Sequence, residues 1–184
     1  MSVILDIQIA DDISESIEEP PPSSQLLAWA QAAWQGESSA EPELSLRIVS
    51  AAESQQLNND YRGKNSPTNV LSFSMEIDAE LLHVLEGQDV AEDDNFSTSM
   101  LGDLAICAEV VEHEANQQNK TLEAHWAHMV VHGMLHLQGY DHIENDQAEE
   151  MEALETSIMQ KIGFSDPYQF TADLIVPSIT DIKS

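Results

Sequence analysis

The stretch that most constrains this chain runs from His132 to His142 and reads HGMLHLQGYDH. His132 and His136 are four residues apart, so on a helix both imidazoles lie on one face. Gly139 follows where a helix can end, because glycine adopts a positive φ at little cost. The reversed chain then brings His142 back toward the first two histidines. Three imidazoles that leave a fourth position open are typical of a catalytic zinc site, so we predict a metal centre here.

Gly133 is the one departure from a known metal-binding pattern. The spacing matches the zinc peptidase motif H-E-x-x-H-x-x-G-x-x-H at the glycine and at the third histidine. Gly133 occupies the position of the glutamate that serves such enzymes as general base. The stretch therefore predicts a metal-binding scaffold whose chemistry is not peptide hydrolysis.

The composition limits the compartment and the partners. The chain has 184 residues, with 34 Asp plus Glu against 6 Lys plus Arg and a formal net charge of −28. Such a surface repels free polyanions and favours basic partners. Cys107 is the single cysteine, and there is neither a basic leader nor a run of ~18 apolar residues. We expect one domain, without a membrane span, in a reducing cytoplasm.

Hydrophobic periodicity and helix caps predict an α+β fold, with a small mixed sheet of about four strands and about five helices. Strands are expected over residues 3–9, 44–48, 70–73 and 101–107, the last of them central. Helices are expected from Ser23 or Ser24, from Ser50 to about Asp60, over 108–119, from Thr121, and from Asp146 to Gly163.

Several finer expectations follow from the same patterns. Residues that should face the core are Val3, Leu5, Ile7 and Ile9 in the first strand and Leu26, Leu27, Ala30 and Trp34 in the first helix. Residues 76–99 form an acidic excursion of open role, and residues 164–184 a loose C-terminal tail. His125 and His128 share a helix side with His132. They could support the metal ligands or contact the substrate, but simple burial is the more common role of such helix histidines.

Arg62 and Lys64 place two of the six basic residues within three positions. In so acidic a chain, this local positive charge points to a functional role for the turn. From the residues alone, however, a solvated turn with an incidental ion pair remains the simpler interpretation.

Several motifs along the chain resemble the YbeY family of bacterial rRNA maturation factors. The likeness spans nearly the whole chain, and it is most specific in the histidine motif with its Gly-Tyr-Asp-His ending. The motifs are Tyr61-Arg62-Gly63-Lys64, Thr68-Asn69-Val70-Leu71-Ser72-Phe73, Leu101-Gly102-Asp103, His132–His142, Glu149–Glu155 and Asp166-Pro167-Tyr168.

The resemblance implies a single-strand-specific endoribonuclease that acts in 16S rRNA 3′-end maturation and ribosome quality control. It implies one Zn²⁺ per chain, held by His132, His136 and His142, with Arg62 as the functional arginine. The expected partners are rRNA presented by the ribosome and basic ribosomal proteins, with no DNA and no membrane. The nucleophile is either water or a substrate 2′-hydroxyl. A noncatalytic, metal-stabilised ribosome-assembly module is the alternative, and a zinc peptidase, disfavoured by Gly133, is third.

Overall fold

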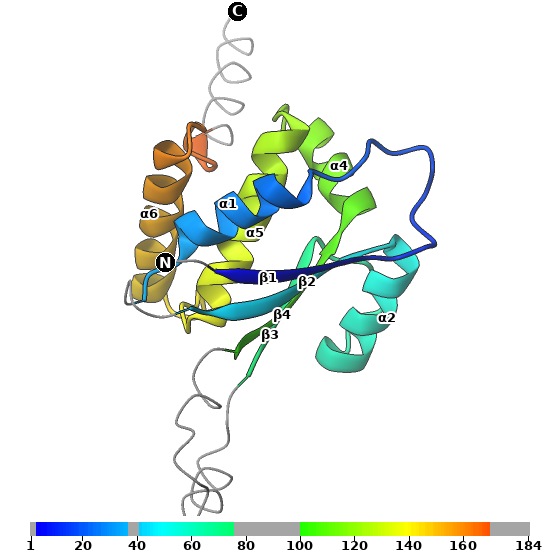
Figure 1. The fold of residues 1–184 in the computed structure, drawn as a ribbon, viewed down its shortest axis with the longest axis horizontal. Helices are drawn as coiled ribbons and strands as arrows, with labels where there is room; N and C mark the ends of the chain where they lie inside the picture. Colours follow the sequence, from blue (N-terminus) through cyan, green and yellow to red (C-terminus); the bar gives the residue numbers. More distant parts are fainter. Residues whose placement is uncertain (1–2, 37–40, 76–99, 170–184) are drawn as a thin grey trace, which may run out of the picture.

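The computed structural model describes residues 3–36, 41–75 and 100–169 (Figure 1). The expected excursion over 76–99 and the tail from 170 onward lie outside these ranges. The described part is α+β, as predicted, with a four-stranded mixed sheet and five helices. Its strands are β1 (Ile4–Ile9), β2 (Glu43–Val49), β3 (Val70–Ser74) and β4 (Met100–Cys107). Its helices are α1 (Ser23–Ala33), α2 (Ala51–Arg62), α4 (Ala108–Gln117), α5 (Leu122–Leu137) and α6 (Asn145–Lys161).

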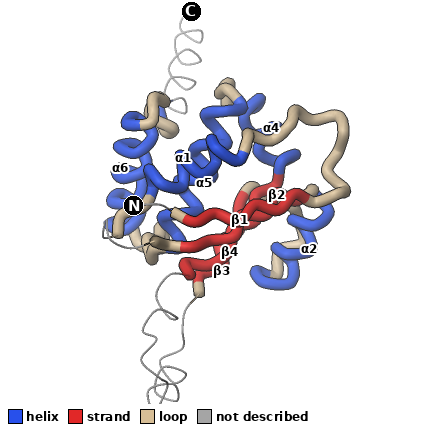
Figure 2. Tube along the Cα trace, in the orientation of Figure 1, coloured by secondary structure: helices blue, strands red, loops and turns tan. Residues whose placement is uncertain are grey.

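The sheet has the strand order β1-β2-β4-β3, so β4 is an inner strand, as predicted. β1, β2 and β4 run parallel, and β3 pairs antiparallel to β4. Figure 2 shows the strands in red with helices on both sides of them. Because β4 is flanked on both sides and covered on both faces, its second half from Leu104 to Cys107 is entirely buried. β3 forms one edge of the sheet, and the histidine helix α5 packs against it.

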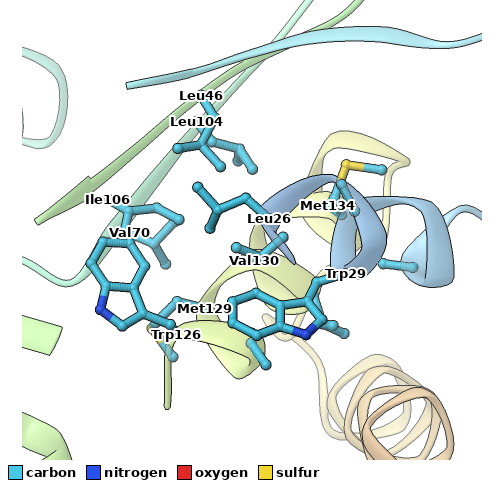
Figure 3. Packing of buried hydrophobic residues seen from close by; sticks show 14 of the residues in the cluster. Leu26, Trp29, Leu46, Val70, Leu104, Ile106, Trp126, Met129, Val130 and Met134 are labelled. Atoms are coloured by element: carbon cyan, nitrogen blue, oxygen red, sulfur yellow. The ribbon is translucent and has the colours of Figure 1, made fainter. Parts of the chain in front are cut away.

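The main hydrophobic core lies between one face of the sheet and helices α1 and α5, with α6 packed against both helices. Figure 3 shows Leu46, Leu104 and Ile106 of the sheet facing Leu26 and Trp29 of α1 and Trp126 and Val130 of α5. A smaller cluster on the other face includes Leu71 and Cys107 and is covered by α2 through Leu57. The two faces thus carry the metal-motif helix and the arginine helix, respectively.

One expectation about side-chain orientation is wrong, and another is incomplete. Ile9 is 57% exposed, at the end of the edge strand β1. In α1 the fully buried residues are Leu26, Trp29, Ala30 and Ala33. The expected Leu27 and Trp34 are partly buried against the same core, Trp34 at the C-cap of the helix.

The helix caps give a mixed outcome. Ser50 accepts a hydrogen bond from the Glu53 backbone N–H, and Thr121 accepts one from that of Ala124, as predicted. α1 instead begins after Pro22 without a side-chain cap.

Within the residues described, no helix is both long and apolar enough to cross a membrane.

Candidate metal centre and cleft

The three motif histidines come from the last turns of α5 and the reversal that follows it. His132 and His136 lie on α5, which ends at Leu137. Gly139 has φ 94°, and the Tyr140 backbone N–H bonds back to the Leu135 carbonyl. This helix-ending turn is the one predicted from Gly139, and it directs the chain carrying His142 back over the helix end.

The imidazoles of His132, His136 and His142 converge. Each offers a ring nitrogen, and these three nitrogens all lie within 4.8 Å of one another. The Nε2 atoms of His132 and His136 are 3.0 Å apart. Zinc–nitrogen bonds of about 2.0–2.1 Å in a tetrahedron put neighbouring nitrogens about 3.3–3.4 Å apart. The donor set and its spacing therefore fit a zinc ion.

Burial keeps His136 in the form that binds metals. Burial of the ring is the main cause that lowers its pKa from 6.5 to about 4, and the nearby rings of His132 and His142 lower it further. At neutral pH the His136 imidazole is therefore uncharged, with a nitrogen lone pair available for a cation.

Glu155 of α6 completes the centre. In the sequence it stands only as the last residue of the Glu149–Glu155 motif, and no role is predicted for it there. Its carboxylate is fully buried and accepts hydrogen bonds from Nδ1–H of His132 and from the Tyr168 hydroxyl. The Nε2 atom of His128 lies 3.4 Å from the same carboxylate. With its Nδ1 proton held by Glu155, His132 presents the Nε2 lone pair toward His136.

The charge on Glu155 is stabilised by these partners. Burial alone raises its pKa, but the hydrogen bonds from His128 and His132 and the favourable electrostatic interaction with the two rings outweigh that effect and lower it from 4.5 to about 2. Burial raises the pKa of Tyr168, and the adjacent carboxylate raises it further, so the hydroxyl remains a donor. Tyr168 lies within the segment expected to be a loose tail.

Glu155→Gln should weaken zinc binding about 10- to 100-fold, the usual cost of losing a carboxylate that orients a histidine ligand. The glutamine keeps the shape of the side chain but no longer fixes the His132 tautomer. Competition with a chromophoric chelator measures the affinity, and Glu152→Gln, at an exposed position of the same helix, is the control. Parental affinity in Glu155→Gln would show that Glu155 does not orient the site.

The structure gives a packing reason for Gly133. A Cβ atom added there would lie 2.7 Å from Cδ2 of Leu104 and 3.4 Å from Cγ2 of Val70. Position 133 therefore faces the sheet, not the histidines, and the helix approaches β3 and β4 closely because no side chain intervenes. A glutamate at this position would enter the core instead of reaching the cleft.

Gly133→Ala should lower the free energy of unfolding by about 1 kcal/mol, because an overpacking cost of about 1–3 kcal/mol exceeds the gain in helix propensity. A shift of that size lowers Tm by about 2–4 °C in a chain of this length. Adding Leu104→Val should recover part of the loss in a double-mutant cycle. If the two substitutions are simply additive, the contact between Gly133 and Leu104 does not limit the packing.

The predicted arginine lies in the same cleft as the histidines. A cavity of about 660 Å³ is lined by Arg62, by His132, His136 and His142, and by polar residues of β3 including Ser72. α2 extends to Arg62, slightly beyond the expected end near Asp60, and Gly63 caps it with φ 67°. Among the described residues no carboxylate forms an ion pair with Arg62, whereas Arg47 is paired with Glu53 at 2.7 Å. The Arg62 guanidinium is thus open to a ligand in the cleft.

His125 and His128 are both buried, and they differ in what they contact. His125 lies 2.7 Å from the Glu114 carboxylate, which also accepts from the Asn69 amide. His128 shares the Glu155 carboxylate with His132. His125 therefore fits the simple buried role, whereas His128 belongs to the network that supports the histidine centre.

Comparisons with known proteins give a family match and a likeness to a solved structure. A sequence model of a protein family, described as Endoribonuclease YbeY, matches residues 10–163. The chain is also similar to the solution structure of a protein from Thermotoga maritima. The two are 24% identical with a TM-score of 0.49, and the match covers 86% of this chain and 89% of that one.

Proposed function

The chain belongs to the YbeY family of endoribonucleases, and from this premise we propose that it is a zinc-dependent enzyme cleaving single-stranded RNA. Its role would be in 16S rRNA 3′-end maturation and ribosome quality control in the cytoplasm, with residues 1–184 acting as one domain. The observation that carries this proposal is the cleft itself. Three convergent imidazoles line one cavity together with a guanidinium that has no ion-pair partner among the described residues.

The chemistry of phosphodiester cleavage fits these groups. Negative charge builds up on the non-bridging phosphate oxygens during the reaction. A zinc ion held by His132, His136 and His142 would supply a Lewis acid there. Arg62 would hold the same phosphate through two parallel hydrogen bonds from its planar guanidinium. Glu155 keeps the His132 proton on Nδ1, away from the cleft.

The acidic surface favours RNA that is presented by a particle. With a net charge of −28, the chain as a whole repels free RNA, but screening beyond about 8 Å at physiological salt leaves the local field of Arg62 effective. Basic ribosomal proteins would contact the acidic surface and bring the rRNA strand to the cleft.

The proposal is tested with metal-analysed protein incubated with single-stranded RNA, ribosomal particles and extended peptides. We expect zinc-dependent RNA cleavage that is faster when the RNA is part of a ribosomal particle. The peptides should remain uncut, because Gly133 offers no general base for peptide hydrolysis. Binding of zinc and particles without any turnover would instead indicate the noncatalytic assembly module. Tight binding of free RNA with a steep salt dependence would contradict the role of the particle.

A further inference from the structure

We propose that Tyr61, supported by Phe73, is a platform on which a nucleobase of the RNA substrate stacks beside the cleft. This inference rests on the proposed ribonuclease function and deepens it, since it names the residue that would select single strands. Neither aromatic residue lines the cavity that holds the histidines and Arg62.

Tyr61 is exposed in a way that packing does not explain. It lies in the last turn of α2 and is 68% exposed. Its ring meets that of Phe73 edge-to-face, with the centroids 4.9 Å apart at an interplanar angle of 63°. Phe73 is half-buried in the cluster under α2 and thus holds the Tyr61 ring in position. Within the described ranges the Tyr61 hydroxyl has no hydrogen-bond partner. What the ring presents to solvent is an aromatic surface in a fixed orientation.

The pair lies just around the sheet edge from the histidines. Alternate residues of β3 point to opposite faces, so Ser72 and Ser74 line the cleft whereas Phe73 packs toward α2. Tyr61 precedes Arg62, and adjacent helix residues project about 100° apart. One side chain therefore reaches into the cleft while its neighbour covers Phe73. In Figure 1, α2 and α5 both run toward the end of the sheet where β3 ends.

This placement suits an unpaired nucleotide. A strand whose phosphate is held by Arg62 would pass over edge strand β3 and bring a neighbouring base onto Tyr61. Every base has a π face, so stacking on an aromatic ring tolerates any sequence, and it provides affinity without attracting phosphates. That matters in a chain with 34 acidic residues and 6 basic ones. Bases inside a duplex are already stacked on each other and are not available to Tyr61.

The test compares Tyr61→Leu, which keeps an apolar cover on Phe73, with Tyr61→Phe and Tyr61→Trp, which keep an aromatic face. Single-turnover cleavage of a short single-stranded RNA is measured against protein concentration, together with zinc content and Tm. A 2-aminopurine base beside the scissile phosphate reports stacking through fluorescence quenching. Ile9→Ala, at an exposed apolar position on the opposite edge strand, controls for nonspecific surface effects.

We expect Tyr61→Leu to raise the half-saturating protein concentration about 5- to 100-fold and to lose the quenching, with zinc, Tm and maximal rate retained. Tyr61→Phe, Tyr61→Trp and Ile9→Ala should behave like the parent. If Tyr61→Leu matches Tyr61→Phe in both measurements, the platform is wrong and the aromatic pair is structural. Quenching without cleavage by the parent would refute the ribonuclease function and leave the platform standing, whereas absence of both would refute the two together.

Discussion

His136→Ala should lose zinc binding and RNA cleavage together. The substitution removes one of three imidazoles whose ligand nitrogens lie within 4.8 Å of one another, and two remaining protein ligands hold zinc weakly. Because a ligand that binds only the folded state stabilises it by mass action, the variant should also lose the zinc-dependent part of its Tm. Metal analysis, thermal melts with and without zinc, and single-turnover cleavage measure the three effects.

A matched histidine variant makes this result specific. His113 lies exposed on α4 and does not line the cleft, so His113→Ala should retain zinc, Tm and cleavage. If His136→Ala cleaves RNA at the parental rate without bound metal, the histidine centre is not the catalytic site. If it keeps zinc with parental affinity, the ligand set is different.

Arg62→Ala should keep its zinc and nearly all of its stability. It should nevertheless cleave RNA on the order of 100- to 1000-fold more slowly, which is the typical cost of removing one donor that stabilises transition-state charge. The stability change should be small, because Arg62 is exposed, forms no ion pair in the described structure, and gains only about 0.3–1 kcal/mol from the helix C-terminus. Arg62→Lys should recover only part of the rate, since an ammonium cannot form two parallel hydrogen bonds with a phosphate. Single-turnover cleavage, zinc content and Tm are measured for each variant.

Arg47→Ala is the control for removing a positive charge from so acidic a chain. Arg47 is engaged by Glu53 and lies outside the cleft, so its loss should leave cleavage unchanged. A parental rate in Arg62→Ala would exclude the phosphate-binding role. A loss of zinc in Arg62→Ala would make Arg62 a structural residue of the turn.

Residues of the site that are close together along the chain could be predicted from the sequence, whereas those brought together by tertiary packing could not. The histidine cluster was predictable because its spacing and the Gly139 turn are local properties of one helix and its exit. Glu155 comes from another helix, 23 residues from His132, and only tertiary packing brings it there. One signal was present: Glu155 lies between Met151 and Ile158 on the buried face of α6. A carboxylate within an apolar stripe requires buried partners.

Orientation errors arose where the pattern was ambiguous. α1 is rich in alanine, leucine and tryptophan around its axis, so periodicity alone did not identify Trp29 and Ala33 as part of its fully buried face. Gly133 departs from the zinc peptidase motif, and the packing that favours glycine there involves Leu104 on another element. Contacts between elements, which no local pattern records, account for these gaps.

The unequal exposure of the three histidines would set an order for metal exchange at the proposed zinc site. His132 and His136 are fixed on a helix that packs against the sheet, whereas the His142 side chain is 59% exposed on the turn beyond Gly139. An arriving ion would meet two preformed ligands first and be enclosed when the turn brings in the third. Release would follow the reverse order, with His142 dissociating from the ion first. The lifetime of the bound ion would then depend on the stiffness of that short turn more than on the helix that carries most of the ligands.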